Sequence, residues 1–335
     1  MSKRSFRIRE GEPLLDIVSY GRGVHHGSSG RLTSYQVDHI RRTVQRVPEA
    51  VVKVLPRDSN DLNGAGRHLN YIGRYGKLEL ETDDGERVQG KKIGKSLLEE
   101  WDVDIDEVRR QANLSGTKGR APPKLVHKLM FSMPPGSPPE KVFAAVRNFA
   151  REEFALQHRY AFVLHTDEAH PHVHLVLKAI SEQGVRLNIR KATLRHWRSE
   201  FARNLRQLGV AANATERAVR GEARKAKKDG IYRASLRGDS THIRAQAQAV
   251  ARELQYGDLP TTADEAMLIK TRREVDQGWR SVSNRLRQEG RLELAGEVRR
   301  FADSMPPAQS DRIRVADELR KTALTQPGRL HRQYP

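Results

Sequence analysis

The sequence predicts an α+β domain, in which an antiparallel β-sheet packs helices on one face, followed by an α-helical C-terminal region. Segments rich in apolar and β-branched residues read as strands, and amphipathic stretches and tight hairpin turns separate them. From residue 216 onward this strand pattern gives way to basic and amphipathic helical stretches. We therefore divide the chain into a basic, largely disordered arm over 1–48, a folded domain over 49–212, and a basic helical region with a frayed tail over 213–335.

The elements are expected in the following order. The spacing of hydrophobic residues and the capping residues predict the helices. Alternation of apolar and polar residues with a period of two, together with an Asp-Gly turn, predicts the strands. The expected elements are a short helix over 34–46, a strand over 50–55, a helix over 58–74, a hairpin over 76–86, a helix over 96–106, a strand over 125–133, a helix over 138–154, strands over 160–164 and 172–178, a short strand over 184–188 and a helix over 191–208.

The most informative stretch runs from His165 to His174, His-Thr-Asp-Glu-Ala-His-Pro-His-Val-His, between the two strand candidates at 160–164 and 172–178. If these strands pair as an antiparallel hairpin with His165 opposite His172, then His165, His172 and His174 project from one face. The intervening positions on both strands are apolar and form the opposite face. A slip of one residue would destroy both faces, so the pattern specifies this register.

Three imidazoles that converge on one point favour a metal site over a merely solvated polar loop, because neutral imidazole is the commonest protein metal ligand. Three protein ligands leave the coordination sphere open, as a catalytic metal requires. The chain has no cysteine, so the histidines must carry any metal. Asp167 and His170 lie in the bend, where they can orient a ligand or move a proton, or serve only as turn residues.

Composition points to a polyanionic partner. The 335 residues include 61 Lys and Arg against 42 Asp and Glu, a net charge of +19, which fits nucleic acid best and is also compatible with a generally basic protein. We find no apolar run long enough to cross a membrane and no hydrophobic segment behind the N-terminus, so we expect no membrane insertion, no secretory signal and a cytosolic protein.

A metal bound by neutral imidazoles keeps its full charge, which suits polarisation of a phosphodiester. The nucleophile is then either water or a side chain that becomes linked to DNA. Tyr71 is the best candidate because it lies off the apolar stripe of its helix and among basic residues, Arg67, Arg74 and Lys77, which we expect to contact the substrate. Taken alone, such a tyrosine is more often an ordinary surface residue.

Three motifs in this chain resemble those of the conjugative relaxases, the mobilisation nucleases of the HUH endonuclease superfamily. His165-x-Asp167-x4-His172-x-His174 is similar to their third motif. Asn70-Tyr-Ile-Gly-Arg-Tyr-Gly-Lys-Leu-Glu-Leu80 resembles their first motif, most closely in the T-DNA border-nicking branch, and its nucleophile aligns with Tyr71. Residues 126–136 resemble the second motif, in which a serine at Ser132 contacts DNA near the nick. The resemblance covers residues 50–210.

This resemblance implies a strand-specific DNA nicking and rejoining enzyme. Tyr71 would attack a phosphodiester at a transfer origin in single-stranded DNA, giving a 5′-phosphotyrosyl adduct and a free 3′-hydroxyl. His165, His172 and His174 would hold Mg²⁺ or Mn²⁺, and Asp167 would act as base or orienter. Tyr75, four residues after Tyr71, is a possible second nucleophile but more readily a loop residue.

The resemblance also implies partners and a location. These are an accessory DNA-binding protein, a type IV coupling protein, and a bacterial cytoplasm from which the protein leaves with its bound strand. The alternatives are a rolling-circle replication initiator, a non-covalent DNA-binding accessory protein and a phosphohydrolase that uses water.

Overall fold

The computed structural model describes residues 31–55, 61–106, 123–222, 231, 234, 235, 237–257 and 259–325. These residues form two compact units. Arg46–Ala214 make up the first unit, and the second contains the described residues of 14–45 and 215–335. Residues 1–30 of the expected arm and most of the basic run after residue 222 lie outside the described residues.

The first unit is built on a six-stranded sheet in which all the paired strands are antiparallel, in the order β1-β4-β6-β5-β2-β3. β4 and β6 are the longest strands, and every residue of β6 is buried because helices cover both faces of the sheet. The strands are β1 Val51–Val54, β2 Leu80–Thr82, β3 Arg87–Val88, β4 Val126–Ser132, β5 Tyr160–His165 and β6 His172–Lys178.

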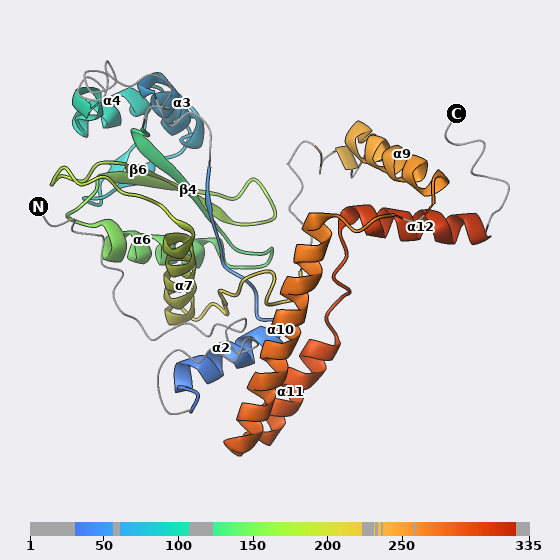
Figure 1. Cartoon of the computed structure of the whole chain (residues 1–335). Helices are drawn as coiled ribbons and strands as arrows, with labels where there is room; N and C mark the ends of the chain where they lie inside the picture. The colour runs from blue at the N-terminus through green and yellow to red at the C-terminus, as the bar shows by residue number, and fades with distance from the viewer. Residues whose placement is uncertain are drawn as a thin grey trace, which may run out of the picture. The chain divides into compact units, whose positions relative to one another are not determined.

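Two helical layers cover this sheet, one on each side (Figure 1). α6 and α7 pack on one face, over a core that includes Phe131, Phe162 and Val173. α3 and α4 pack on the opposite face, over Ala161, Val163 and other apolar residues. The helices are α3 Leu62–Ile72, α4 Ile93–Glu100, α6 Pro139–Phe154 and α7 Lys191–Gln207.

The antiparallel sheet with packed helices and the helical C-terminal region are confirmed, but helices cover both faces of the sheet and not one. The α3–α4 layer covers part of the face that carries the histidines. α3 and α4 approach closely because Gly66 and Gly94 meet at their crossing, where a Cβ on Gly94 would lie 2.2 Å from the Gly66 carbonyl oxygen. The short strand expected over 184–188 is wrong, since the chain makes only a single bridge there, between Ile180 and Arg186.

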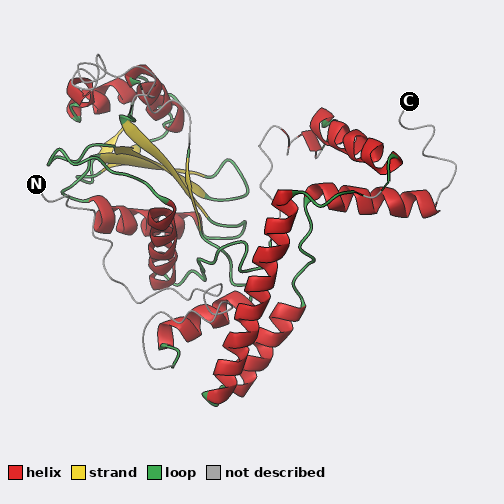
Figure 2. Cartoon of the chain, viewed as in Figure 1, coloured by secondary structure: helices red, strands yellow, loops and turns green. Residues whose placement is uncertain are grey.

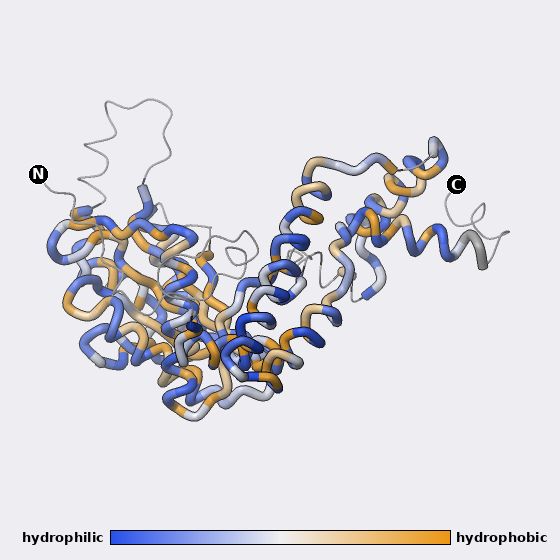
Figure 3. Tube along the Cα trace, turned by 60° about the horizontal axis from the view of Figure 1, so that its bottom comes forward, coloured by the Kyte–Doolittle hydropathy of each residue, from blue (hydrophilic) through white to orange (hydrophobic). Residues whose placement is uncertain are grey.

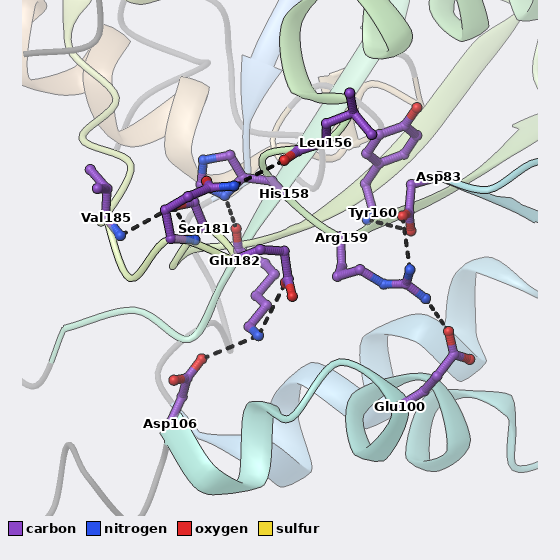
Figure 4. Close-up of polar contacts among 12 residues, drawn as sticks. Asp83, Glu100, Asp106, Leu156, His158, Arg159, Tyr160, Ser181, Glu182 and Val185 are labelled. Carbon is purple, nitrogen blue, oxygen red and sulfur yellow. Dashed lines mark hydrogen bonds and ion pairs between the residues drawn. The ribbon is translucent and has the colours of Figure 1, made fainter.

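Ion pairs hold the end of the sheet that lies farthest from the histidines. Arg159, just before β5, pairs with Asp83 of the β2–β3 turn at 3.1 Å and with Glu100 of α4 (Figure 4). Lys178, the last residue of β6, lies 3.8 Å from Asp106. These contacts tie the α4 segment to the strand ends, so the covering layer is anchored away from the candidate site.

The second unit is entirely helical in the part of the chain that the structure describes (Figure 2). Its core joins α2, from the N-terminal stretch, to α10 and α11, with Ile40, Trp279 and Phe301 buried together. The long helices alternate between hydrophilic and hydrophobic residues, as amphipathic helices do (Figure 3). The helices are α2 Ser34–Val44, α9 Thr241–Gln255, α10 Ala263–Gln288, α11 Leu292–Asp303 and α12 Asp311–Thr325.

The helix expected over 34–46 is thus present as α2, and it begins with a capping box between Thr33 and Gln36. Thr262 and Glu265 form another at the start of α10. Within the described ranges, none of the helices combines the length and the apolarity needed to cross a membrane.

Candidate metal centre and nucleophile

Three histidines from two paired strands form one cluster at the end of the sheet. His165 ends β5 and lies directly opposite His172, which begins β6. His174 follows two positions later on the same face. The ring centroids are separated by 5.2 Å for His165 and His172, 4.8 Å for His165 and His174, and 5.2 Å for His172 and His174. The register predicted from the sequence is confirmed, and it brings the three imidazoles together.

Hydrogen bonds orient two of these rings. His165 Nε2 lies 2.7 Å from the Ile72 carbonyl oxygen, and His172 Nδ1 lies 3.0 Å from the His170 carbonyl oxygen. A carbonyl only accepts, so these nitrogens carry the protons and the other nitrogen of each neutral ring keeps a lone pair. His174 Nδ1 is buried and has no hydrogen-bond partner in the described part of the chain.

The cluster fits a single divalent cation. Each of the three buried residues offers one ligand atom, and these atoms lie within 4.8 Å of one another. The oriented lone pair of His172 and the buried nitrogen of His174 that lacks a partner are features that metal coordination satisfies, whereas His165 Nδ1 accepts from Arg74 Nη2 at 3.3 Å. The three imidazole donors are softer than Mg²⁺ or Mn²⁺ prefers, and they suit other divalent transition metals as well.

Burial keeps two of the ligands neutral. Burial, together with the smaller effect of the neighbouring His165 and His172, lowers the pKa of His174 to about 3. The pKa of His165 is also lowered, chiefly by burial, although the Ile72 carbonyl opposes the shift. These two imidazoles are therefore unprotonated near neutral pH, which is the state that binds a metal.

Tyr71 lies in the last turn of α3 and outside its buried stripe. Ala65, Leu69 and Ile72 face the core, whereas the Tyr71 side chain keeps 48% of its surface exposed. The guanidinium carbon of Arg74 lies 5.4 Å from the centroid of the phenol ring. The ring is therefore accessible to a substrate and close to a positive charge.

Arg74 connects the tyrosine to the histidine cluster. It adopts a left-handed backbone conformation with φ of 50°, which is uncommon for a residue with a long side chain. Its Nη2 lies 3.3 Å from His165 Nδ1 and pairs with Asp167, whose side chain is 55% exposed. Asp167 thus contacts Arg74 and does not contact Tyr71 directly. The structure therefore gives no direct contact for the role of base that we expected for Asp167.

The other expected residues surround this centre. Ser132 ends β4 directly opposite His172, so the two side chains project from the same face. Arg67 on α3 and Lys77 in the turn after it are exposed. Tyr75 is 64% exposed and also has a positive φ, of 55°.

Sequence reasoning missed His68. This residue lies three positions before Tyr71 on α3, and its ring centroid is 6.4 Å from that of Tyr71 and 6.1 Å from that of His174. The spacing of three residues, which places two side chains on one side of a helix, was the signal that could have found it. The Ile72 carbonyl, which receives the His165 hydrogen bond, carries no side-chain signal and could not have been found from the sequence.

An antiparallel sheet that presents a three-histidine cluster beside an exposed tyrosine is the arrangement expected from the resemblance to the relaxases. Residues 76–210 match the family model for the relaxase MobA/VirD2-like nuclease domain. The matched region holds the three histidines and Ser132, and Tyr71 lies just before its first residue.

Among curated proteins, the chain is similar to the T-DNA border endonuclease VirD2 of Agrobacterium fabrum. The two are 23% identical over 233 residues, which cover 63% of this chain and 49% of that protein. The chain therefore spans about half the length of this relative. No solved structure matches the chain significantly.

Proposed function

We propose that this protein nicks and rejoins one strand of DNA at a transfer origin, with Tyr71 as the nucleophile. The observation that carries the proposal is the convergence of Tyr71 and the histidine cluster. Arg74 lies 5.4 Å from the Tyr71 ring centroid and 3.3 Å from His165 Nδ1, although Tyr71 and His165 are far apart in the sequence. A phosphate at this point would be within reach of both.

In the proposed reaction the Tyr71 oxygen attacks the phosphorus of one phosphodiester and displaces the 3′-oxygen. The products are a 5′-phosphotyrosyl link and a 3′-hydroxyl, which takes up a proton as it leaves. Because one phosphodiester replaces another, the reverse attack by a 3′-hydroxyl rejoins the strand. When bound by His165, His172 and His174, Mg²⁺ or Mn²⁺ supplies positive charge that polarises the phosphodiester.

The chain's own residues supply the remaining interactions. The guanidinium of Arg74, whose carbon lies 5.4 Å from the Tyr71 ring centroid, supplies positive charge beside the reacting phenol. Asp167 holds Arg74 in place, and because it does not contact Tyr71 directly, the phenol proton is proposed to pass to solvent water or through water to Asp167. Ser132, Arg67 and Lys77 are proposed to bind the sugar-phosphate backbone next to the reacting phosphate.

The biological setting is proposed on the same grounds. The net charge of +19 favours single-stranded DNA as the substrate, and the border endonuclease to which the chain is similar acts on DNA by its name. We further propose conjugative mobilisation as the process, an accessory DNA-binding protein and a type IV coupling protein as partners, and the bacterial cytoplasm as the place of nicking before export with the strand.

A denaturing gel tests the covalent step. The protein is incubated with Mn²⁺ or Mg²⁺ and with 3′-labelled single strands that tile the DNA flanking its own gene. The 3′ label stays with the adduct because the tyrosine retains the 5′ phosphate. We expect a slow band for the native protein and for Tyr75→Phe, and none for Tyr71→Phe, which should bind the same strand with nearly unchanged affinity.

Other results contradict the proposal. Labelled fragments without an adduct indicate hydrolysis by water. Binding without cutting by the native protein indicates an accessory role. Loss of the adduct in Tyr75→Phe, with retention in Tyr71→Phe, assigns the nucleophile to Tyr75.

A further inference from the structure

The His68 ring contacts both the proposed nucleophile and the histidine cluster. The His68 and Tyr71 rings are stacked, with 25° between their planes and 6.4 Å between their centroids. The His68 ring also meets His174 edge to face, at 76° and 6.1 Å. Both separations fall within the range of favourable aromatic contacts. His68 therefore forms a continuous row of rings from Tyr71 to the cluster.

The backbone that carries Tyr71 is held in place independently of this row. The Ile72 carbonyl accepts a hydrogen bond from His165 Nε2 at 2.7 Å. The side-chain oxygen of Asn70 accepts a hydrogen bond from the Gly94 N–H at 2.8 Å, which ties α3 to the start of α4. The position of the Tyr71 Cα is thereby fixed on both sides.

The direction of the Tyr71 ring is not fixed by those backbone contacts. An exposed tyrosine on a helix can change its side-chain rotamer, and each rotamer places the hydroxyl several ångströms from the others. His68, three residues before Tyr71, and Arg74, three residues after it, both lie against the phenol ring. Each also contacts a proposed metal ligand, since His68 meets His174 and Arg74 lies 3.3 Å from His165 Nδ1. His68 is the one that stacks its ring on the phenol, so its ring relates the direction of the phenol to the cluster.

We propose that His68 is a positioning residue that holds the Tyr71 ring in the rotamer directed toward the histidine cluster. The inference rests on the proposed function, because it concerns the nucleophile of that reaction. In this proposal the shape and stacking of the His68 ring, and not its ring nitrogens, hold the Tyr71 rotamer. An aromatic side chain of similar width should therefore replace histidine, whereas alanine should not.

The kinetic test measures adduct formation in a single turnover with the 3′-labelled strand and Mn²⁺. His68→Ala should slow adduct formation on the order of two- to tenfold, the loss expected when one aromatic contact no longer selects the rotamer. His68→Phe should restore most of the rate. Asn63→Ala, an exposed position on the same helix, is the control and should leave the rate unchanged.

Calorimetric titration with Mn²⁺ separates positioning from damage to the metal site. Both His68 variants should bind Mn²⁺ within about twofold of the native protein. A rate in His68→Phe as low as in His68→Ala overturns the proposal, because the imidazole nitrogens and not the ring would then matter. A loss of Mn²⁺ affinity that matches the loss of rate overturns it as well, as does an unchanged rate in His68→Ala.

A second measurement needs no DNA and so remains informative if the native protein makes no adduct. Incorporation of 3-fluorotyrosine labels all eight tyrosines, and the Tyr71 signal in the ¹⁹F spectrum is the one that Tyr71→Phe removes. His68→Ala should shift and broaden this signal, and Asn63→Ala should not. An unmoved Tyr71 signal in His68→Ala refutes the ring contact, whereas absence of an adduct in the native protein refutes the proposed function instead.

Discussion

Metal binding by the histidine cluster should resist acid more than an ordinary three-histidine site does. Protons compete with a metal for imidazole nitrogens. Burial lowers the pKa of His174 to about 3 and also lowers the pKa of His165. The perturbation that we consider is a change of pH from 7.5 to 5.5, which crosses the ordinary histidine pKa of about 6.5.

The expected magnitude follows from the protonation equilibria. An imidazole with a pKa of 6.5 is about 90% protonated at pH 5.5, and its competition weakens metal binding about tenfold between the two pH values. Three such ligands would weaken binding about a thousandfold, or roughly 4 kcal/mol. At a pKa of about 3, His174 stays neutral throughout and contributes none of this loss. His165 contributes less than an ordinary imidazole because its pKa is lowered too.

Calorimetric titration of Mn²⁺ into the protein at both pH values measures this difference. We expect an affinity loss of less than about a hundredfold, with fewer protons released per bound ion than three ordinary histidines would release. A loss near a thousandfold would show that His174 and His165 are protonated at pH 5.5. That result would refute the burial argument and the compact geometry from which it comes.

Three further predictions concern stability. Burial lowers the pKa of His127 to about 4, so between pH 4 and 6.5 the native state binds fewer protons than the unfolded chain. The resulting contribution of His127 to the free energy of unfolding, about 3 kcal/mol, is present above pH 6.5 and is lost as the pH falls to 4. His127→Leu should therefore flatten the dependence of the unfolding free energy on pH in urea titrations, and an unchanged slope would contradict this. Glu81→Gln should lower the free energy of unfolding by about 2 kcal/mol in the same assay, because buried Glu81 accepts two hydrogen bonds from Arg147, one of them at 2.6 Å. A decrease below about 0.5 kcal/mol, as expected for an exposed ion pair, would be inconsistent with that burial. Gly94→Ala should lower the melting temperature by several degrees, because its Cβ would lie 2.2 Å from the Gly66 carbonyl oxygen, and an unchanged temperature would mean that α3 and α4 are farther apart.

The histidine hairpin shows what the sequence could predict. Alternation of polar and apolar residues on both strands left one register that buries the apolar face, and the structure pairs His165 with His172 as expected. The placement of Tyr71 off the helix stripe followed from the same periodic argument. These are local patterns, read over a few residues.

Contacts between segments that are distant in the chain could not be predicted in this way. The α3–α4 layer depends on the close approach of Gly66 and Gly94, and the periodicity of the sequence does not predict this contact. The pairing of Arg74 with Asp167 needs both a left-handed residue after α3 and a bend after β5. In the second unit, Ile40 of α2 packs with Trp279 of α10, and the sequence of neither helix indicates which other helix it packs against.

The central claim is that the Tyr71 hydroxyl becomes linked to DNA, and mass spectrometry of the linked peptide tests it most directly. The adduct is purified under denaturing conditions, its DNA is trimmed with a nuclease, and the tryptic peptides are sequenced. We predict that the residual nucleotide is attached to Tyr71. A nucleotide on Tyr75 or on any other residue would contradict the account.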